Sequence, residues 1–94
     1  MIYLVAMHRA HPGCEGVLKQ SLVALIAPTR AEAGCIRYEL HEARGHPGRF
    51  LFYEVWETQA HLDAHAASAH LAAYNETSRD WIAATELLPL DFVA

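Results

Sequence analysis

The sequence lacks the features that mark several large classes of protein. Its 94 residues include only two cysteines, Cys14 and Cys35, and no Cys-x-x-Cys pair. We therefore expect neither a disulfide framework nor a zinc or thiol-exchange site, and both thiols should be reduced. The five glycines match neither the dinucleotide-binding pattern nor the P-loop pattern, so no tightly bound nucleotide is expected.

Basic charge and long apolar segments are also scarce. Seven lysines and arginines against eleven acidic residues give a formal net charge of −4, and no basic run is present. Since no basic patch could neutralise phosphates, we expect no nucleic acid and no membrane among the partners. The apolar run from Ile2 to Met7 is too short to span a membrane, and no positively charged signal-peptide segment precedes it. The expected location is cytoplasmic.

Apolar material, by contrast, is in surplus. Hydrophobic residues make up 53% of the chain and charged residues 19%, whereas an average domain has roughly 45–50% and 25%. This composition excludes disorder. No linker or repeat divides residues 1–94, so we expect one small domain, whose core alone is marginal. The surplus therefore points to a partner subunit.

Apolar periodicity and turn residues predict four strands and two helices. Pro28 should end the first helix, and Pro89 argues for an edge position or a break in the last strand. Thr58 and Ser68 are the expected N-caps of a second helix in two parts. The predicted elements are a strand at 2–10, a helix at 15–27, strands at 36–42 and 50–57, a helix at 58–67 continued at 69–81, and a strand at 85–93.

This order, β-α-β-β-α-β, is that of the α+β ferredoxin-like split βαβ fold, an antiparallel sheet with its helices on one face. The helices can cover only that face, yet the first and third strands are apolar on both. In the third strand, Tyr53 and Val55 lie on one face and Phe52 and Trp56 on the other. A second copy of the chain is the simplest cover for the other face, which predicts a homodimer.

Seven histidines are the most informative residues for chemistry. His11 and His46 adjoin prolines in turns and should be solvated. At 100° per residue, His65 shares the inward side of its helix with Leu62, whereas His61 lies toward the flank. A metal held by His61 and His65 is one interpretation, but the Glu of an HExxH motif and a third ligand are missing, so we expect no metal. The structural alternative for His65 is a hydrogen-bonded core histidine.

Aromatic and acidic residues on the third strand and last helix are further candidates. Glu54 and Trp56 share a face of their strand, and an indole can both form the wall of a flat pocket and donate one hydrogen bond. Tyr74 and Trp81 lie seven apart on the last helix. His8, at the end of the first strand, and Tyr38 are weaker candidates. From spacing alone, each of these side chains is also consistent with ordinary core packing.

Four stretches resemble the antibiotic biosynthesis monooxygenase domain family: residues 29–40, 47–50, 52–56 and 65–71. Their most specific part is E-x-W at Glu54 to Trp56 followed by H-x-x-S-x-H at His65 to His70. The resemblance implies a dimeric α+β barrel in which two sheets face each other and each subunit keeps a pocket between its sheet and helices. It also implies one of three activities: cofactor-independent quinol or anthrone oxidation, haem degradation, or a non-oxidative reaction on an autoinducer.

The haem-degrading branch is disfavoured. It has a tryptophan where this chain has His65, a ligating histidine near Asn75 and an asparagine near His8, and none of the three matches. The oxygenase branch implies an electron-rich phenolic, quinol or polyketide-like aromatic substrate, which is deprotonated so that its anion reduces O₂ directly without a cofactor. A histidine is a suitable base for a phenol, and an apolar pocket would retain the anion.

The expected catalytic residues are His65, as base or substrate-orienting group, and Trp56, as pocket wall and hydrogen-bond donor on the oxyanion side of the substrate. The expected substrate-binding residues are His8, Glu54, His70 and Tyr74. Two other functions stay open because fold does not determine function. One is an isomerase or lyase acting on a small hydroxy-ketone or lactone, and the other is a dimeric binding module without turnover.

Overall fold

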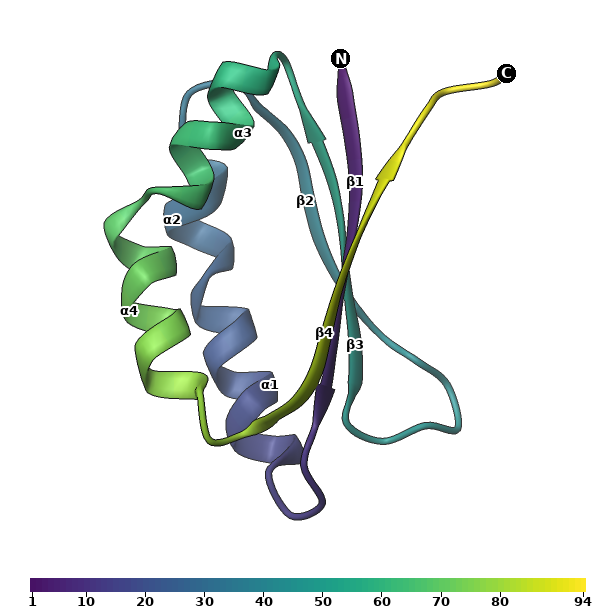
Figure 1. Cartoon of the computed structure of the whole chain (residues 1–94), viewed down its shortest axis with the longest axis vertical. Coiled ribbons are helices and arrows are strands. Elements are labelled where there is room, and N and C mark those ends of the chain that lie inside the picture. The colour runs from purple at the N-terminus through teal and green to yellow at the C-terminus, as the bar shows by residue number, and fades with distance from the viewer.

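The computed structural model describes residues 1–94 as a four-stranded sheet with four helical segments on one face (Figure 1). Its first half contains β1 (Ile2–Ala10), α1 (Glu15–Ala24), α2 (Ile26–Arg30) and β2 (Cys35–Glu42). Its second half contains β3 (Arg49–Trp56), α3 (Gln59–Ala66), α4 (Ala69–Ser78) and β4 (Ile82–Leu90). The predicted β-α-β-β-α-β order is confirmed. The second helix is in two parts with Thr58 and Ser68 as N-caps, as predicted, and the first helix is also divided in two.

The strand order is β2-β3-β1-β4, and every neighbouring pair is antiparallel. This is the ferredoxin-like arrangement. Because directly paired residues share a face, the register fixes which side chains point at the helices. One row across the sheet joins Tyr38, Glu54, Leu4 and Pro89 on the helix side.

The first predicted helix was expected to stop at Pro28, and the structure corrects this. Helix α1 ends at Ala24, the chain makes one tighter turn in which the Leu25 amide donates to the Leu22 carbonyl over 3.1 Å, and α2 then runs to Arg30. Pro28 lies in the first turn of α2, where its missing amide hydrogen would have had no partner within the helix. The helical path therefore extends toward Glu32.

The last helix and the last strand are also shifted from their predicted limits. Helix α4 ends at Ser78 rather than near Trp81, and β4 covers Ile82–Leu90 rather than 85–93. The reason is that β1 offers pairing positions from Ala10, opposite Ile82, to Tyr3, opposite Leu90. Strand β4 pairs only with β1, so the edge position expected from Pro89 is confirmed.

The core lies between the helices and the inner face of the sheet. Trp56, Leu18 and Leu22 are completely buried, and Phe52 stacks on Tyr38 with ring centroids 4.3 Å apart. Such a stacked pair contributes about 0.5–1.5 kcal/mol beyond burial of its area. This packing determines how far the helices stand from the strands, and hence where side chains from the two layers meet.

The opposite face of the sheet carries no helix (Figure 1). Tyr3, Val5 and Met7 of β1 lie on it, and Leu88 of β4 is 44% exposed there. The C-terminal segment adds Phe92, which stacks on Tyr3 at 5.8 Å and is still 71% exposed. Apolar side chains thus occupy a face that nothing in this chain covers. No helix of the chain combines the length and apolar character that crossing a membrane requires.

Candidate active site

A break between two helices brings the main candidate residues together. His65 and His70 are five positions apart, and on one continuous helix their side chains would diverge by about 140°. Instead α3 ends at Ala66, and α4 restarts with Ser68 as its N-cap, its hydroxyl accepting from the Leu71 amide. Ser68 also donates to the His65 carbonyl over 2.7 Å. The change of direction turns both imidazoles toward the same point.

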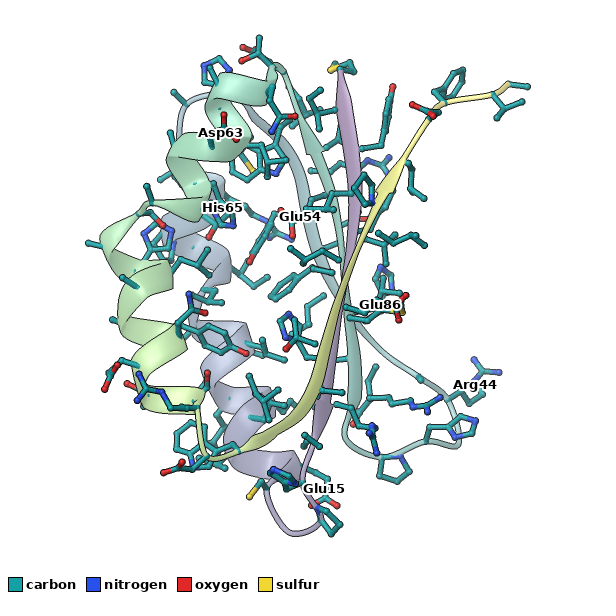
Figure 2. All side chains as sticks on the ribbon, viewed as in Figure 1. Glu15, Arg44, Glu54, Asp63, His65 and Glu86 are labelled. Atoms are coloured by element: carbon teal, nitrogen blue, oxygen red, sulfur yellow. The ribbon has the colours of Figure 1, made fainter.

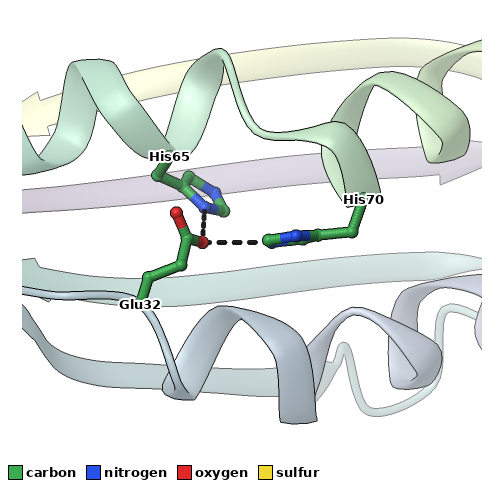
Figure 3. A group of neighbouring side chains, drawn as sticks. All are labelled: Glu32, His65 and His70. Carbon is green, nitrogen blue, oxygen red and sulfur yellow. Dashed lines mark hydrogen bonds and ion pairs between the residues drawn. The ribbon is translucent and has the colours of Figure 1, made fainter.

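That point is the carboxylate of Glu32, between α2 and β2 (Figure 3). Its Oε2 lies 2.7 Å from Nδ1 of His65 and 3.0 Å from Nε2 of His70. The His65 side chain is 6% exposed and that of Glu32 is 16% exposed. One carboxylate oxygen therefore lies within hydrogen-bond distance of two imidazoles, that of His65, which is buried, and that of His70, which is 25% exposed.

Two hydroxyls complete the surroundings of His70. Its Nε2 lies 3.2 Å from the Thr29 hydroxyl and 3.3 Å from the Ser68 hydroxyl, in addition to Glu32. His70 is predicted to contact the substrate. In the structure its Nε2 is directed at groups of the chain itself, chiefly the Glu32 carboxylate.

Glu54 lies on the sheet side of His65 (Figure 2). Trp56, two residues later on β3, packs its ring against the same imidazole. The Trp56 indole donates to Oε1 of Glu54 over 3.0 Å, and the same Oε1 lies 3.9 Å from Nε2 of His65. Burial raises the pKa of the Glu54 carboxyl. The Trp56 hydrogen bond and the nearby His65 oppose that rise, and Glu32 adds to it. His65 thus has one glutamate on each side of its ring, hydrogen-bonded at Nδ1 only.

Aromatic rings surround the imidazole of His65. The Trp56 ring centroid lies 4.8 Å away, and that of Tyr38 lies 5.5 Å away, edge on. Burial, and to a lesser degree the charge of Glu54, raises the pKa of the Tyr38 phenol, which therefore stays neutral. The site combines one imidazole, two carboxyl groups and aromatic walls, a set that can move a proton in a largely dry environment.

His8 and Tyr74 form a separate polar group. Their rings meet edge on at 6.1 Å, and His8 lies four residues along β1 from Leu4, the partner of Glu54, or about 13 Å. Burial lowers the pKa of His8 and raises that of Tyr74. Nδ1 of His8 and the Tyr74 hydroxyl are buried without hydrogen-bond partners. These two predicted binding residues therefore do not join His65 directly.

The remaining sequence predictions for histidine are resolved by position. His11 and His46 are exposed, as expected, and His61 lies at the flank of α3, where its Nδ1 is 2.8 Å from the Thr58 hydroxyl. His61 and His65 do not share a site. Glu32, His65 and His70 are the residues whose donor atoms, within 4.8 Å of one another, have the composition of a metal site. In the structure each of the two histidine nitrogens hydrogen-bonds to the Glu32 carboxylate.

Glu32, Thr29 and Ser68 belong to this site although the sequence did not predict them there. Glu32 is 33 positions from His65, and no local pattern links the two. The sequence feature that could have pointed to Glu32 is Gly34, two residues after it. The positive φ of Gly34, +80°, turns the chain from α2 into β2. A hollow of about 430 Å³ lies elsewhere, across one end of all four strands, and of the predicted site residues only His8 borders it.

Comparison with known proteins identifies the family. The antibiotic biosynthesis monooxygenase signature matches residues 1–77. Rv0793 from Mycobacterium tuberculosis, whose name assigns it provisionally as a monooxygenase, is 33% identical over 94 residues, covering 96% of this chain and 92% of that protein.

Solved structures agree with this assignment. The crystal structure of PA3566 from Pseudomonas aeruginosa superposes with a TM-score of 0.95 at 32% identity, covering 99% of this chain and 94% of that one. SO0527 from Shewanella oneidensis gives 0.90 at 32% identity, with coverages of 95% and 87%. The chain belongs to the antibiotic biosynthesis monooxygenase family.

Proposed function

We propose that this chain is a cofactor-independent monooxygenase that oxidises an electron-rich phenolic, quinol or polyketide-like aromatic substrate with O₂. Membership of the monooxygenase family supports the reaction class. The observation that carries the proposal is the buried His65 imidazole between the rings of Trp56 and Tyr38. Histidine exchanges protons near neutral pH, and aromatic walls suit a flat aromatic substrate.

The spacing around Nε2 of His65 suits one substrate hydroxyl. This nitrogen makes no hydrogen bond within the chain, and Oε1 of Glu54 lies 3.9 Å from it. One oxygen atom can lie about 2.8 Å from both atoms, which is ordinary hydrogen-bond length. His65 would take the phenolic proton at Nε2. Glu54, already bonded to Trp56, would contact the same oxygen.

The proposed reaction needs no external reductant. Once His65 has removed the phenolic proton, the phenolate passes one electron to O₂, and the two radicals join through a C–O bond at a ring carbon that carries hydrogen. The O–O bond then breaks as that C–H bond is lost, leaving a quinone. The distal oxygen departs as water with the phenolic proton and the former C–H proton. One phenol and one O₂ thus give one quinone and one water.

Access would be from the β4 side of the inner face. Leu87 pairs with Ala6 and so faces the helix layer, yet it is 61% exposed while Ala6 is buried. The helices therefore leave the inner side of β4 largely uncovered. A ring entering there would pass apolar side chains before it reached His65, which favours retention of the phenolate and O₂ over water.

A homodimer is part of the same proposal. The uncovered sheet face carries Val5, Met7 and Leu88, and the segment after β4 contains Phe92 and Val93, which are 71% and 93% exposed. Contiguous apolar surface of this kind is uncommon on monomers. A second sheet packed on this face would form the barrel that the family resemblance implies, with each His65 site on the far side of its own sheet.

Oxygen uptake with a panel of hydroquinones, naphthols and anthrones tests the function. We expect uptake that requires protein, and product mass spectra that contain one atom from ¹⁸O₂, with the other in water. Turnover of a hydroxy-ketone that continues under anaerobic conditions would indicate the isomerase or lyase alternative. Thermal stabilisation by these compounds without any turnover would indicate a binding module.

A further inference from the structure

The Glu32 carboxylate determines which ring nitrogen of His65 carries the proton. Nδ1 lies 2.7 Å from Oε2 of Glu32, a length typical of a charge-assisted hydrogen bond. An ionised carboxylate can only accept, so the ring nitrogen must be the donor. A neutral imidazole carries one proton, and if that proton is on Nδ1, Nε2 has the free lone pair. Nε2 is the atom that faces Glu54 and the aromatic walls.

We propose that Glu32 is a positioning residue, which holds His65 in the tautomer whose Nε2 is free to accept the substrate proton. Glu32 does not touch the substrate. It orients the imidazole and, once the ring is protonated, its negative charge stabilises the imidazolium. The acidic residue of hydrolase triads has the same role toward its histidine.

The carboxylate is itself held from several sides. His70 bonds the same Oε2 at 3.0 Å, and Thr29 and Ser68 in turn contact Nε2 of His70. Thr29 is completely buried, and its position on α2 depends on the helix continuing past Pro28. His70 therefore anchors Glu32, and the break between α3 and α4 lets His65 and His70 share one acceptor. A single hydrogen bond would leave a glutamate side chain freer to rotate.

The tautomer can be measured without any substrate. Two-bond ¹H–¹⁵N correlation spectra distinguish a protonated ring nitrogen from a bare one, and they should be recorded at a pH where the ring is neutral. In the wild type we expect the proton of His65 on Nδ1. In Glu32→Ala the Nε2–H form should become populated. A wild-type spectrum with the proton on Nε2 would overturn the proposal even if no variant folds.

A matched control is available on the other side of the sheet. Glu39 also lies beside a histidine, His41, at 4.0 Å, but both side chains are about half exposed. Glu39→Ala removes a carboxylate of the same kind and should leave the His65 spectrum unchanged. An equal shift in both variants would show a general loss of structure rather than a specific contact.

The catalytic consequence rests on the proposed function, whereas the tautomer does not. With an accepted quinol, Glu32→Ala should lower kcat on the order of 10²–10⁴-fold with little change in KM, because Glu32 orients the base rather than binding substrate. If the wild type oxidises a quinol but His65 does not carry its proton on Nδ1, the role of Glu32 is wrong and the proposed function stands. If the proton is on Nδ1 but no substrate gives oxygen uptake, the proposed function is wrong and the tautomer assignment stands.

Two further results would contradict the assignment. Glu32→Ala with wild-type kcat would show that the contact is only structural. Stoichiometric Zn²⁺ or Fe²⁺ binding by the wild type, lost in Glu32→Ala, would show that Glu32, His65 and His70 act as metal ligands, in keeping with their spacing. Isothermal titration of the wild type with each metal alone distinguishes this outcome. We expect it to show no stoichiometric binding.

Discussion

The Trp56 indole donates a hydrogen bond to the carboxyl of Glu54 over 3.0 Å, although both side chains come from the same strand and both are buried. Residues two apart on a strand point to the same face, which makes this contact possible. The bond satisfies the one donor of the indole and holds the Glu54 oxygen 3.9 Å from His65. Trp56 therefore contributes to the site through Glu54 as well as through its ring.

Replacing Trp56 by phenylalanine should remove that donor while keeping an aromatic ring. We expect a loss of about 1–3 kcal/mol in the free energy of unfolding for the unpaired buried carboxyl, with a further loss from the smaller side chain. Urea unfolding measures the total loss in the free energy of unfolding. Trp81→Phe is the matched control, since Trp81 is half-buried and its indole makes no hydrogen bond within the chain. Equal losses in the two variants would contradict the role of the Trp56 bond.

Burial of Glu54 predicts a pH dependence of stability. Its pKa is raised in the folded protein, mainly by burial, relative to an unperturbed value of 4.5. The folded state thus binds the proton more tightly, and the stability from this group, complete below pH 4.5, falls as pH rises through the folded pKa. In Glu54→Gln that fall should be absent, so the variant should gain stability relative to wild type as pH rises. Urea melts from pH 4 to 8 test this. A constant difference across the series would contradict it.

The proposed homodimer predicts a charge-sensitive surface. Leu88→Glu places a charge on the uncovered sheet face, and we expect light scattering to change from about twice the 10.5 kDa chain mass to the monomer mass. Val23→Glu is the control, because Val23 is 54% exposed on helix α1, on the other side of the molecule. A wild-type monomer at micromolar concentration would contradict the proposed barrel.

Gly34 should tolerate no side chain. Its φ is +80°, and an added Cβ would meet the ring of His61. Gly34→Ala should therefore lower the free energy of unfolding by more than about 1 kcal/mol, through backbone strain and the clash. Gly13→Ala has a similar φ of +90° but open space around it, so the difference between the two variants isolates the clash. Equal losses would show that only the backbone angle matters.

The sequence predicted the sheet well because its signals are local. Alternation in β1 and β3 predicted which residues share a face of the sheet, although not which face meets the helices. Helical periodicity identified His65 as inward and His61 as flanking. The extension of the first helix was missed because a proline in the first turn of a helix resembles one that ends it. The Glu32 contact was missed because it depends on how α2 docks against α3 and α4, which no spacing along the chain encodes.

The central claim is that His65 is the base of an oxygenase, and oxygen uptake by His65→Ala tests it most directly. With a quinol that the wild type accepts, and well below the melting transition, the rate should fall on the order of 10²–10⁴-fold while light scattering still gives the dimer mass. Urea melts of the same samples record any loss of stability separately. Wild-type oxygen uptake by a destabilised His65→Ala protein would contradict the claim and leave His65 as a core histidine.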